Sequence, residues 1–130
     1  MIHTAQYRVY IEDTDMMRVV YHSNYLNFFE RARTEWLRNH EMTLTDLAKN
    51  DTYFAVRHLA IEYKNALVLD DLFTVETEVK LTGFCQIQFI QTMFNQSGIV
   101  VSTAVVDAVC VNQNMRPRRL PPGVTKELKE

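Results

Sequence analysis

The sequence predicts an α+β domain in which one amphipathic helix packs against an antiparallel sheet. Residues 23–38 have helical periodicity, whereas one strand-like segment precedes them and several follow them. The last of these segments are separated by short turns, which is typical of antiparallel hairpins. With 130 residues, of which 47% are hydrophobic, the chain can close one modest core. We therefore expect residues 1–130 to form a single domain.

The N-terminal half contains the expected helix. Residues 6–12, QYRVYIE, alternate apolar and polar side chains and predict a half-buried strand. The next periodic segment contains no Gly or Pro, and its apolar stripe is broad enough to need a sheet as its partner. This stripe comprises Tyr25, Leu26, Phe28, Phe29, Ala32, Trp36 and Leu37. Thr43 is a good N-cap and predicts one or two further helical turns after it.

The C-terminal half consists of predicted strands. They cover residues 52–67, 72–81, 84–94 and 99–111. Because the last of them is apolar on both faces, it belongs in the interior of the sheet. The segment beyond it contains all three prolines of the chain and ends in mixed charges, so we expect a turn and then a frayed terminus from about residue 121.

Composition and spacing exclude several function classes. The net charge of -2 and the lack of a basic run argue against nucleic-acid binding. No apolar run approaches the roughly 20 residues of a transmembrane helix, and the first residues do not resemble a signal peptide, so we expect a cytoplasmic protein. Cys85 and Cys110 lack metal-ligand or redox spacing and are expected to be buried thiols. His22, His40 and His58 lack the spacing of a metal site.

Acidic residues gather just before the predicted helix. Glu12, Asp13 and Asp15 precede Ser23 and Asn24, either of which can begin a helix. The unpaired N–H groups of a helix N-terminus favour an anion or a carbonyl oxygen that becomes one. A carboxylate beside them could serve as nucleophile or general base toward that carbonyl. The alternative is that the acids only complement the helix dipole, and the residues alone leave both interpretations open.

A family resemblance favours the catalytic interpretation. The stretch YRVYIEDTDMMRVVYHSNYLNFFERARTEWL resembles the 4-hydroxybenzoyl-CoA thioesterase family of the hotdog fold, and within it the Tol-Pal-associated acyl-CoA thioesterases. The segments FAVRHLAIEYKNALVLDDLFTVETEV and QIQFIQTMFNQSGIVVSTAVVDAVCVNQNMRPRRLP resemble the same subfamily. The resemblance implies an antiparallel sheet wrapped around a long central α-helix. It also implies hydrolysis of an acyl-CoA to a free acid and CoA without metal or organic cofactor.

The resemblance also implies roles for individual residues. Asp15 would act on the thioester carbonyl as nucleophile or as base for water, and the backbone N–H of His22 would polarise the carbonyl oxygen. Asp13 would be structural. Tyr21 and Tyr25 are candidates for contact with the acyl group, although helical spacing fits Tyr25 equally well to the core.

The resemblance implies an assembly as well. A homo-oligomer, either a dimer or a tetramer, would place the site between subunits, with residues 53–63 of the partner chain completing the pocket. The basic segment RPRRLP, at residues 116–121, could contact CoA phosphates or form salt bridges or a subunit contact.

The chain departs from the family pattern at Met17 and Arg18, where the family commonly has two glycines. We expect the loop to have shifted to an ordinary conformation, with Arg18 facing solvent or a CoA phosphate. Two other functions stay open: a non-catalytic acyl-CoA-binding or protein-binding hotdog domain, and an enoyl-thioester hydratase. The intact Asp15 argues against the first, and the D-T-D context argues against the second.

Overall fold

The computed structural model describes residues 2–128 and contains one antiparallel sheet and three α-helices in that range. The elements in chain order are β1 (Ile2–Arg8), the 3-10 helix η1 (Ile11–Asp13), α1 (Asn24–Asn39), α2 (Leu44–Lys49), β2 (Tyr53–Tyr63), β3 (Leu72–Leu81), β4 (Gln86–Asn95), β5 (Val100–Val111) and α3 (Pro122–Leu128). The helical segment between the first and second strands is where the sequence places it.

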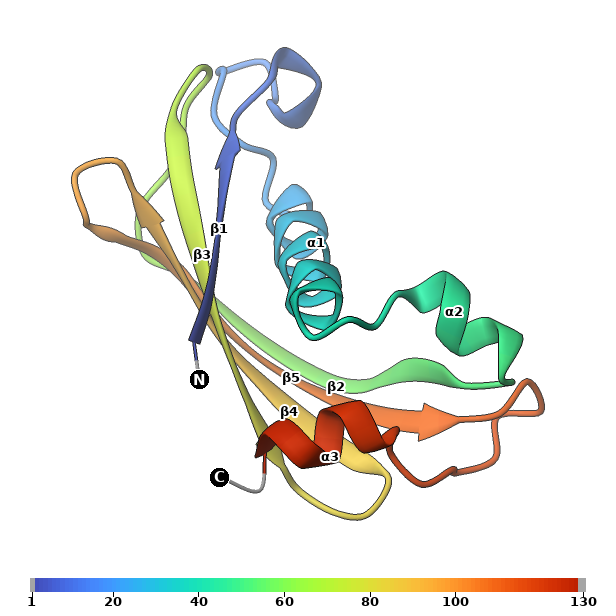
Figure 1. The fold of residues 1–130 in the computed structure, drawn as a ribbon. Helices are drawn as coiled ribbons and strands as arrows, with labels where there is room; N and C mark the ends of the chain where they lie inside the picture. Colours follow the sequence, from blue (N-terminus) through green and yellow to red (C-terminus); the bar gives the residue numbers. More distant parts are fainter. Residues whose placement is uncertain (1, 129–130) are drawn as a thin grey trace.

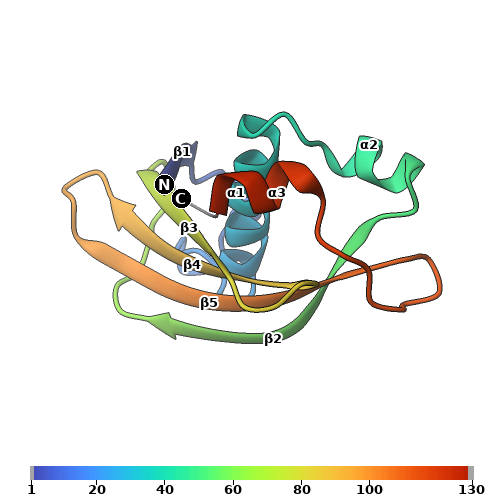
Figure 2. The same cartoon turned by 60° about the horizontal axis from the view of Figure 1, so that its bottom comes forward.

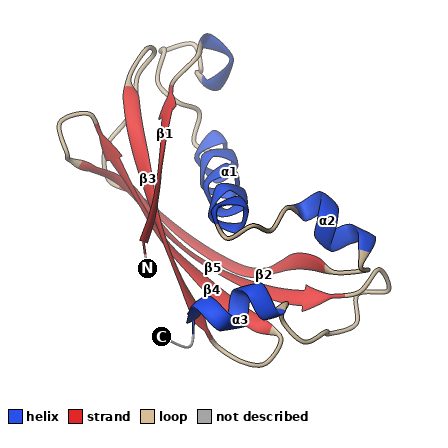
Figure 3. Ribbon diagram, viewed as in Figure 1, coloured by secondary structure: helices blue, strands red, loops and turns tan. Residues whose placement is uncertain are grey.

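The five strands form a curved sheet in the order β1-β3-β4-β5-β2, and every pairing in it is antiparallel. Figures 1 and 2 show α1 lying across the concave face of the sheet, with α2 and α3 near its rim. Figure 3 shows the three helices on the same side of the strands. This arrangement agrees with the predicted α+β class, and β5 lies inside the sheet between β4 and β2 as expected.

The core lies between α1 and the sheet. The buried side chains of α1 are Tyr25, Phe28, Phe29, Ala32, Trp36 and Leu37, which are six of the seven members of the predicted stripe. Strands β3 and β4 bury alternate residues, because successive side chains of a strand point to opposite faces. Burial of this apolar surface is the main stabilising term, at roughly 25 cal/mol for each Å² removed from water.

The structure corrects the prediction at both ends of the chain. Strand β1 ends at Arg8 rather than at Glu12, because the carboxylate of Asp13 accepts the N–H of Tyr10 and closes η1. The predicted frayed terminus is helix α3 up to Leu128, and Val124 in it is fully buried. Pro122 begins this helix, and proline suits the first helical turn, where a missing N–H costs nothing.

Three further observations concern the sheet edge, the cysteines and the helices. Strand β2 lies at one edge of the sheet, so its outer side has no pairing partner among residues 2–128. Cys85 and Cys110 are free and buried, as predicted. None of the described helices is long and apolar enough to cross a membrane.

Candidate active site

The catalytic candidate Asp15 lies in a tight loop that precedes α1. Its Oδ1 accepts the backbone N–H of Met17 at 2.8 Å, and its carbonyl oxygen accepts the N–H of Arg18 at 3.0 Å. The N–H of Asp15 donates to the carbonyl of Val19 at 2.9 Å, which closes the loop. Asp15 is exposed, so its second carboxylate oxygen can face a substrate from outside.

Arg18 has a left-handed backbone, with φ of 63°. The sequence-based expectation that this loop has shifted to an ordinary conformation is therefore wrong. Three backbone hydrogen bonds keep the turn in a geometry that suits glycine: Asp15 N–H to the carbonyl of Val19, Arg18 N–H to the carbonyl of Asp15, and Leu69 N–H to the carbonyl of Arg18 at 3.0 Å. An L-residue there costs about 1 to 2 kcal/mol, and the exposed side chain of Arg18 does not fill the loop.

Asp13 connects the loop to the helix. Its carboxylate accepts a hydrogen bond from the N–H of Tyr10. Its carbonyl oxygen accepts the N–H of Tyr21 at 3.0 Å and the side-chain amide of Asn24 at 2.8 Å. These bonds support the structural role that was expected for Asp13. They also keep the loop that carries Asp15 against the start of α1.

The N-terminus of α1 has free backbone donors. Ser23 is the N-cap residue, but its side chain makes no capping hydrogen bond. Within residues 2–128, the backbone N–H groups of His22 and Ser23 have no acceptor. The carbonyl oxygen of His22 accepts the hydroxyl of Tyr63 at 2.7 Å. The two free N–H groups and the helix dipole form a corner that favours a developing oxyanion.

The aromatic residues at this corner differ in exposure. Tyr21 is 48% exposed, and its ring centroid lies 4.5 Å from that of His22, so both can contact a ligand. Tyr25 is 4% exposed, and its hydroxyl accepts the N–H of Leu67 at 3.1 Å. Burial raises the pKa of Tyr25. The structure therefore gives Tyr25 a core position and does not support its assignment to substrate contact.

The arginines of the basic C-terminal segment also differ in their surroundings. The guanidinium of Arg118 donates to the carbonyls of Asn50 and Asp51, each at 2.8 Å, and so anchors the segment to the end of α2. Arg116 and Arg119 are exposed. Of the two interpretations for RPRRLP, a structural contact is therefore observed for Arg118, and a phosphate contact by the other arginines stays a prediction.

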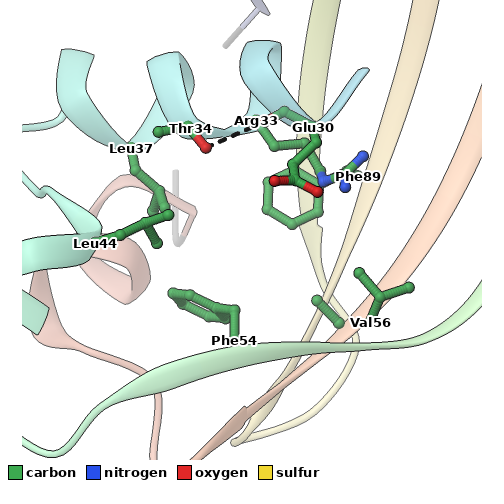
Figure 4. Close-up of a pocket in the computed structure, with 9 residues that line it drawn as sticks. Glu30, Arg33, Thr34, Leu37, Leu44, Phe54, Val56 and Phe89 are labelled. Carbon is green, nitrogen blue, oxygen red and sulfur yellow. Dashed lines mark hydrogen bonds between the residues drawn. The ribbon is translucent and has the colours of Figure 1, made fainter. Parts of the chain in front are cut away.

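A cavity that the sequence analysis missed lies along the second half of α1 (Figure 4). It has a volume of about 200 Å³ and lies between α1, the start of α2, and strands β2, β4 and β5. Its lining residues are Glu30, Arg33, Thr34, Leu37, Leu44, Phe54, Val56, Phe89 and Ala108. In the sequence most of these residues look like ordinary core or surface positions. The sequence does not indicate a cavity, because only the fold brings the residues together.

Arg33 is one of three polar residues that line this cavity, with Glu30 and Thr34. Its guanidinium donates to Gln91 Oε1 at 3.1 Å and lies 5.8 Å from the centre of the Phe89 ring. Gln91 is buried and donates in turn to the carbonyl of Phe29 and to Thr77, so the network fixes α1 on β4 and β3. Burial lowers the pKa of Arg33. The cavity is thus an apolar hollow with one fixed cation in its wall.

The site can be summarised chemically as two separate parts in one chain. A carboxylate and two free N–H groups lie at the start of α1, and they line none of the cavity. Such a pair is suited to attack on an activated carbonyl, with the N–H groups stabilising the oxyanion. Among the described residues, no group of His, Cys, Asp and Glu side chains is arranged to hold a metal ion.

The chain has close relatives among known proteins. The acyl-CoA thioester hydrolase YbgC of Escherichia coli O6:H1 is 39% identical over 124 residues, which cover 95% of this chain and 92% of that protein. The acyl-CoA thioesterase YbgC of Haemophilus influenzae is 45% identical over 119 residues, with 90% of this chain and 87% of that protein covered.

Solved structures agree with these sequence relatives. A probable thioesterase from Bartonella henselae superposes with a TM-score of 0.88 at 35% identity, covering 93% of this chain and all of that chain. A 1,4-dihydroxy-2-naphthoyl-CoA thioesterase from Synechocystis has the same fold, with a TM-score of 0.93 at 19% identity over 100% of this chain and 97% of that chain. The family model of the thioesterase-like superfamily matches residues 9–128. The resemblance seen in the sequence is thereby confirmed, and the chain belongs to the thioesterase-like superfamily.

Proposed function

We propose that this protein is an acyl-CoA thioesterase, which adds water to the thioester carbonyl and releases a free acid and CoA. The observation that carries the proposal is that Asp13 ties the loop of Asp15 to the start of α1, where the N–H groups of His22 and Ser23 are free. Relatives named as acyl-CoA thioester hydrolases, at 39% identity and above, support the same reaction.

Each group at the corner has a defined task. The carbonyl oxygen of the thioester accepts the backbone N–H of His22, which stabilises the negative charge that develops on it. The free oxygen of Asp15 either attacks the carbonyl carbon or removes a proton from the attacking water. The C–S bond then breaks and the CoA thiolate takes up a proton; where Asp15 is the nucleophile, water then hydrolyses the acyl-aspartyl anhydride, which releases the free acid and regenerates the carboxylate. The Met17 N–H holds the other oxygen of Asp15, so the carboxylate is oriented before substrate binds.

The working site is formed by two chains joined along β2. Edge pairing of two β2 strands would cover one of the two edges of each sheet, the other edge being β1. If the strands pair antiparallel about their midpoint, His58, then Phe54 of one chain lies opposite Glu62 of the other. The cavity of one chain, to which Phe54 contributes, then approaches the partner's corner, where Tyr63 contacts His22.

In this assembly α1 is the central helix around which the joined sheets curve. Two such dimers can further associate as a tetramer through the outer faces of their sheets.

We expect the protein in the cytoplasm. Arg18 and the exposed arginines 116 and 119 are the candidates for contact with CoA phosphates, since guanidinium groups pair well with phosphate.

The test is release of free thiol from a panel of acyl-CoAs. Thiol release with at least one acyl group supports the proposal. Binding of acyl-CoA without release would support a non-catalytic hotdog domain instead, and loss of an enoyl-CoA without thiol release would support a hydratase. The exposed Asp15 favours hydrolysis over a binding module, because a module needs no oriented carboxylate at that corner.

A further inference from the structure

Tyr63, the last residue of β2, makes a contact with the helix corner that the proposed reaction does not yet use. Its hydroxyl donates to the carbonyl oxygen of His22 at 2.7 Å across a separation of 41 residues. The ring of Tyr63 packs edge-on against Tyr25, with centroids 5.2 Å apart, and lies 6.5 Å from the ring of His22. The ring of Tyr63 is thus held by the core residue Tyr25, and its hydroxyl is directed at the backbone of His22.

The peptide at His22 lacks the usual restraints of a helix start. The side chain of Ser23 makes no capping bond, and His22 precedes the first residue of α1. Within the range that the structure describes, no backbone N–H donates to the carbonyl of His22, so the Tyr63 hydroxyl is its hydrogen-bond donor. Asn24 and Tyr21 are tied to Asp13, but these bonds restrain the residues on either side rather than His22 itself.

We propose that Tyr63 is a positioning residue that sets the direction of the His22 N–H toward the thioester oxygen. This inference rests on the proposed thioesterase function. An oxyanion donor is effective only if it is oriented before the reaction, since reorientation during the reaction removes most of the gain. With the His22 carbonyl held by the Tyr63 hydroxyl, rotation of the residue about its backbone is restricted, and the N–H on its other side is restricted with it.

The position of Tyr63 also connects the donor to the subunit contact. Tyr63 ends the edge strand β2, which is paired to β5 on one side and open on the other. A second chain added along β2 would therefore contact the strand that holds His22 in place. Tyr63 itself touches neither the reacting carbonyl nor the attacking group in this account.

Tyr63→Phe removes the hydroxyl and keeps the ring contacts with Tyr25 and His22. We expect kcat to fall about three- to tenfold, the worth of one hydrogen bond, with KM unchanged. The matched control is Tyr7→Phe in β1, because the Tyr7 hydroxyl is buried and has no hydrogen-bond partner among the described residues. This control should retain wild-type kcat.

A second readout separates positioning from a purely structural role. The probe is an acyl-CoA analogue in which a methylene group replaces the thioester sulfur, and the measurement is the infrared stretch of its carbonyl. Bound to the wild-type protein, this stretch should lie below its frequency in water, because the His22 N–H polarises the carbonyl. In Tyr63→Phe the frequency should move back toward the value in water, and in Tyr7→Phe it should not.

The inference is wrong if Tyr63→Phe leaves both kcat and the carbonyl frequency at their wild-type values. It is also wrong if the activity loss only follows a lower folded fraction in a thermal melt, with the frequency unchanged. A wild-type protein that binds the analogue but releases no thiol from any acyl-CoA would instead contradict the proposed function. The two failures are therefore distinguishable.

Discussion

The two halves of α1 carry different parts of the proposed site. At the first residues of the helix, a hydrogen-bonded polar loop presents Asp15 and two free N–H groups, and these groups do not line the cavity of about 200 Å³. Farther along the same helix, Arg33 and Glu30 line a mostly apolar cavity. The distance along the axis from Asn24 to Arg33 is about 14 Å, at 1.5 Å for each residue. If the corner carries the reaction and the cavity binds the substrate, then one chain keeps the two apart, and an edge-paired second chain would bring them together.

The largest expected effect comes from removing the carboxylate at the polar end. Asp15→Asn should lower kcat by about 10² to 10⁴-fold, since the amide can serve neither as nucleophile nor as base. Glu30 provides the matched control, because it is the carboxylate that lines the cavity instead. We expect Glu30→Gln to lose less than about tenfold. Steady-state thiol release measures both variants, and a reversed order of effects would move the catalytic role to the cavity.

The next effect concerns the assembly. If chemistry and binding come from different chains, a monomer should be inactive, so specific activity should fall when the protein is diluted below the dissociation constant of the dimer. Light scattering at micromolar concentration should give a dimer or a tetramer. Full activity in a sample that light scattering shows to be monomeric would contradict the two-chain site.

A smaller effect tests whether Tyr25 is structural. Tyr25→Phe leaves the buried N–H of Leu67 without its acceptor and should lower the free energy of unfolding by about 1 to 3 kcal/mol. KM should change little. Urea unfolding and thiol release measure the two quantities, and an intact stability with a raised KM would restore Tyr25 to the substrate contacts.

The same variant has a predicted pH dependence. Burial raises the pKa of Tyr25 in the folded protein. The neutral hydroxyl therefore contributes stability that is fully present below the unfolded pKa of about 10 and is lost as the pH rises through the folded pKa. The stability advantage of the wild type over Tyr25→Phe should accordingly shrink above about pH 10.

The smallest effect comes from the strained loop beside the catalytic carboxylate. Arg18→Gly should raise the free energy of unfolding by about 1 kcal/mol, because glycine adopts the left-handed conformation without strain. Arg18→Ala keeps the unfavourable conformation and should give no such gain. Thermal melts distinguish the two, and equal melting temperatures for both variants would show that the loop is not strained. Turnover should change little in either variant, because the conformation around Asp15 is retained.

The sequence predicted the fold and the polar corner better than the cavity, for a physical reason. Alternation and helical periodicity depend on local residues, so α1, β3 and β5 could be placed to within a few residues. The corner was also local, since Asp15 and His22 lie close together in the chain. The cavity depends on packing between Thr34, Phe54 and Phe89, which are distant in sequence, and no periodic signal reports such contacts. Likewise, the fully buried Val124 depends on tertiary contacts of α3, although the composition of that segment resembles a frayed tail.

The most direct test of the two-chain site is complementation between two inactive variants. Asp15→Asn removes the carboxylate, and Thr34→Trp places an indole ring in the cavity. Each variant alone should be inactive, and both should remain folded dimers by light scattering. After unfolding and refolding together, half of the dimers are mixed, and one of the two sites in a mixed dimer has both an intact Asp15 and an intact cavity. If the site is formed by two chains, about a quarter of wild-type activity should return in the mixture. No recovery would show that both parts of the site come from the same chain.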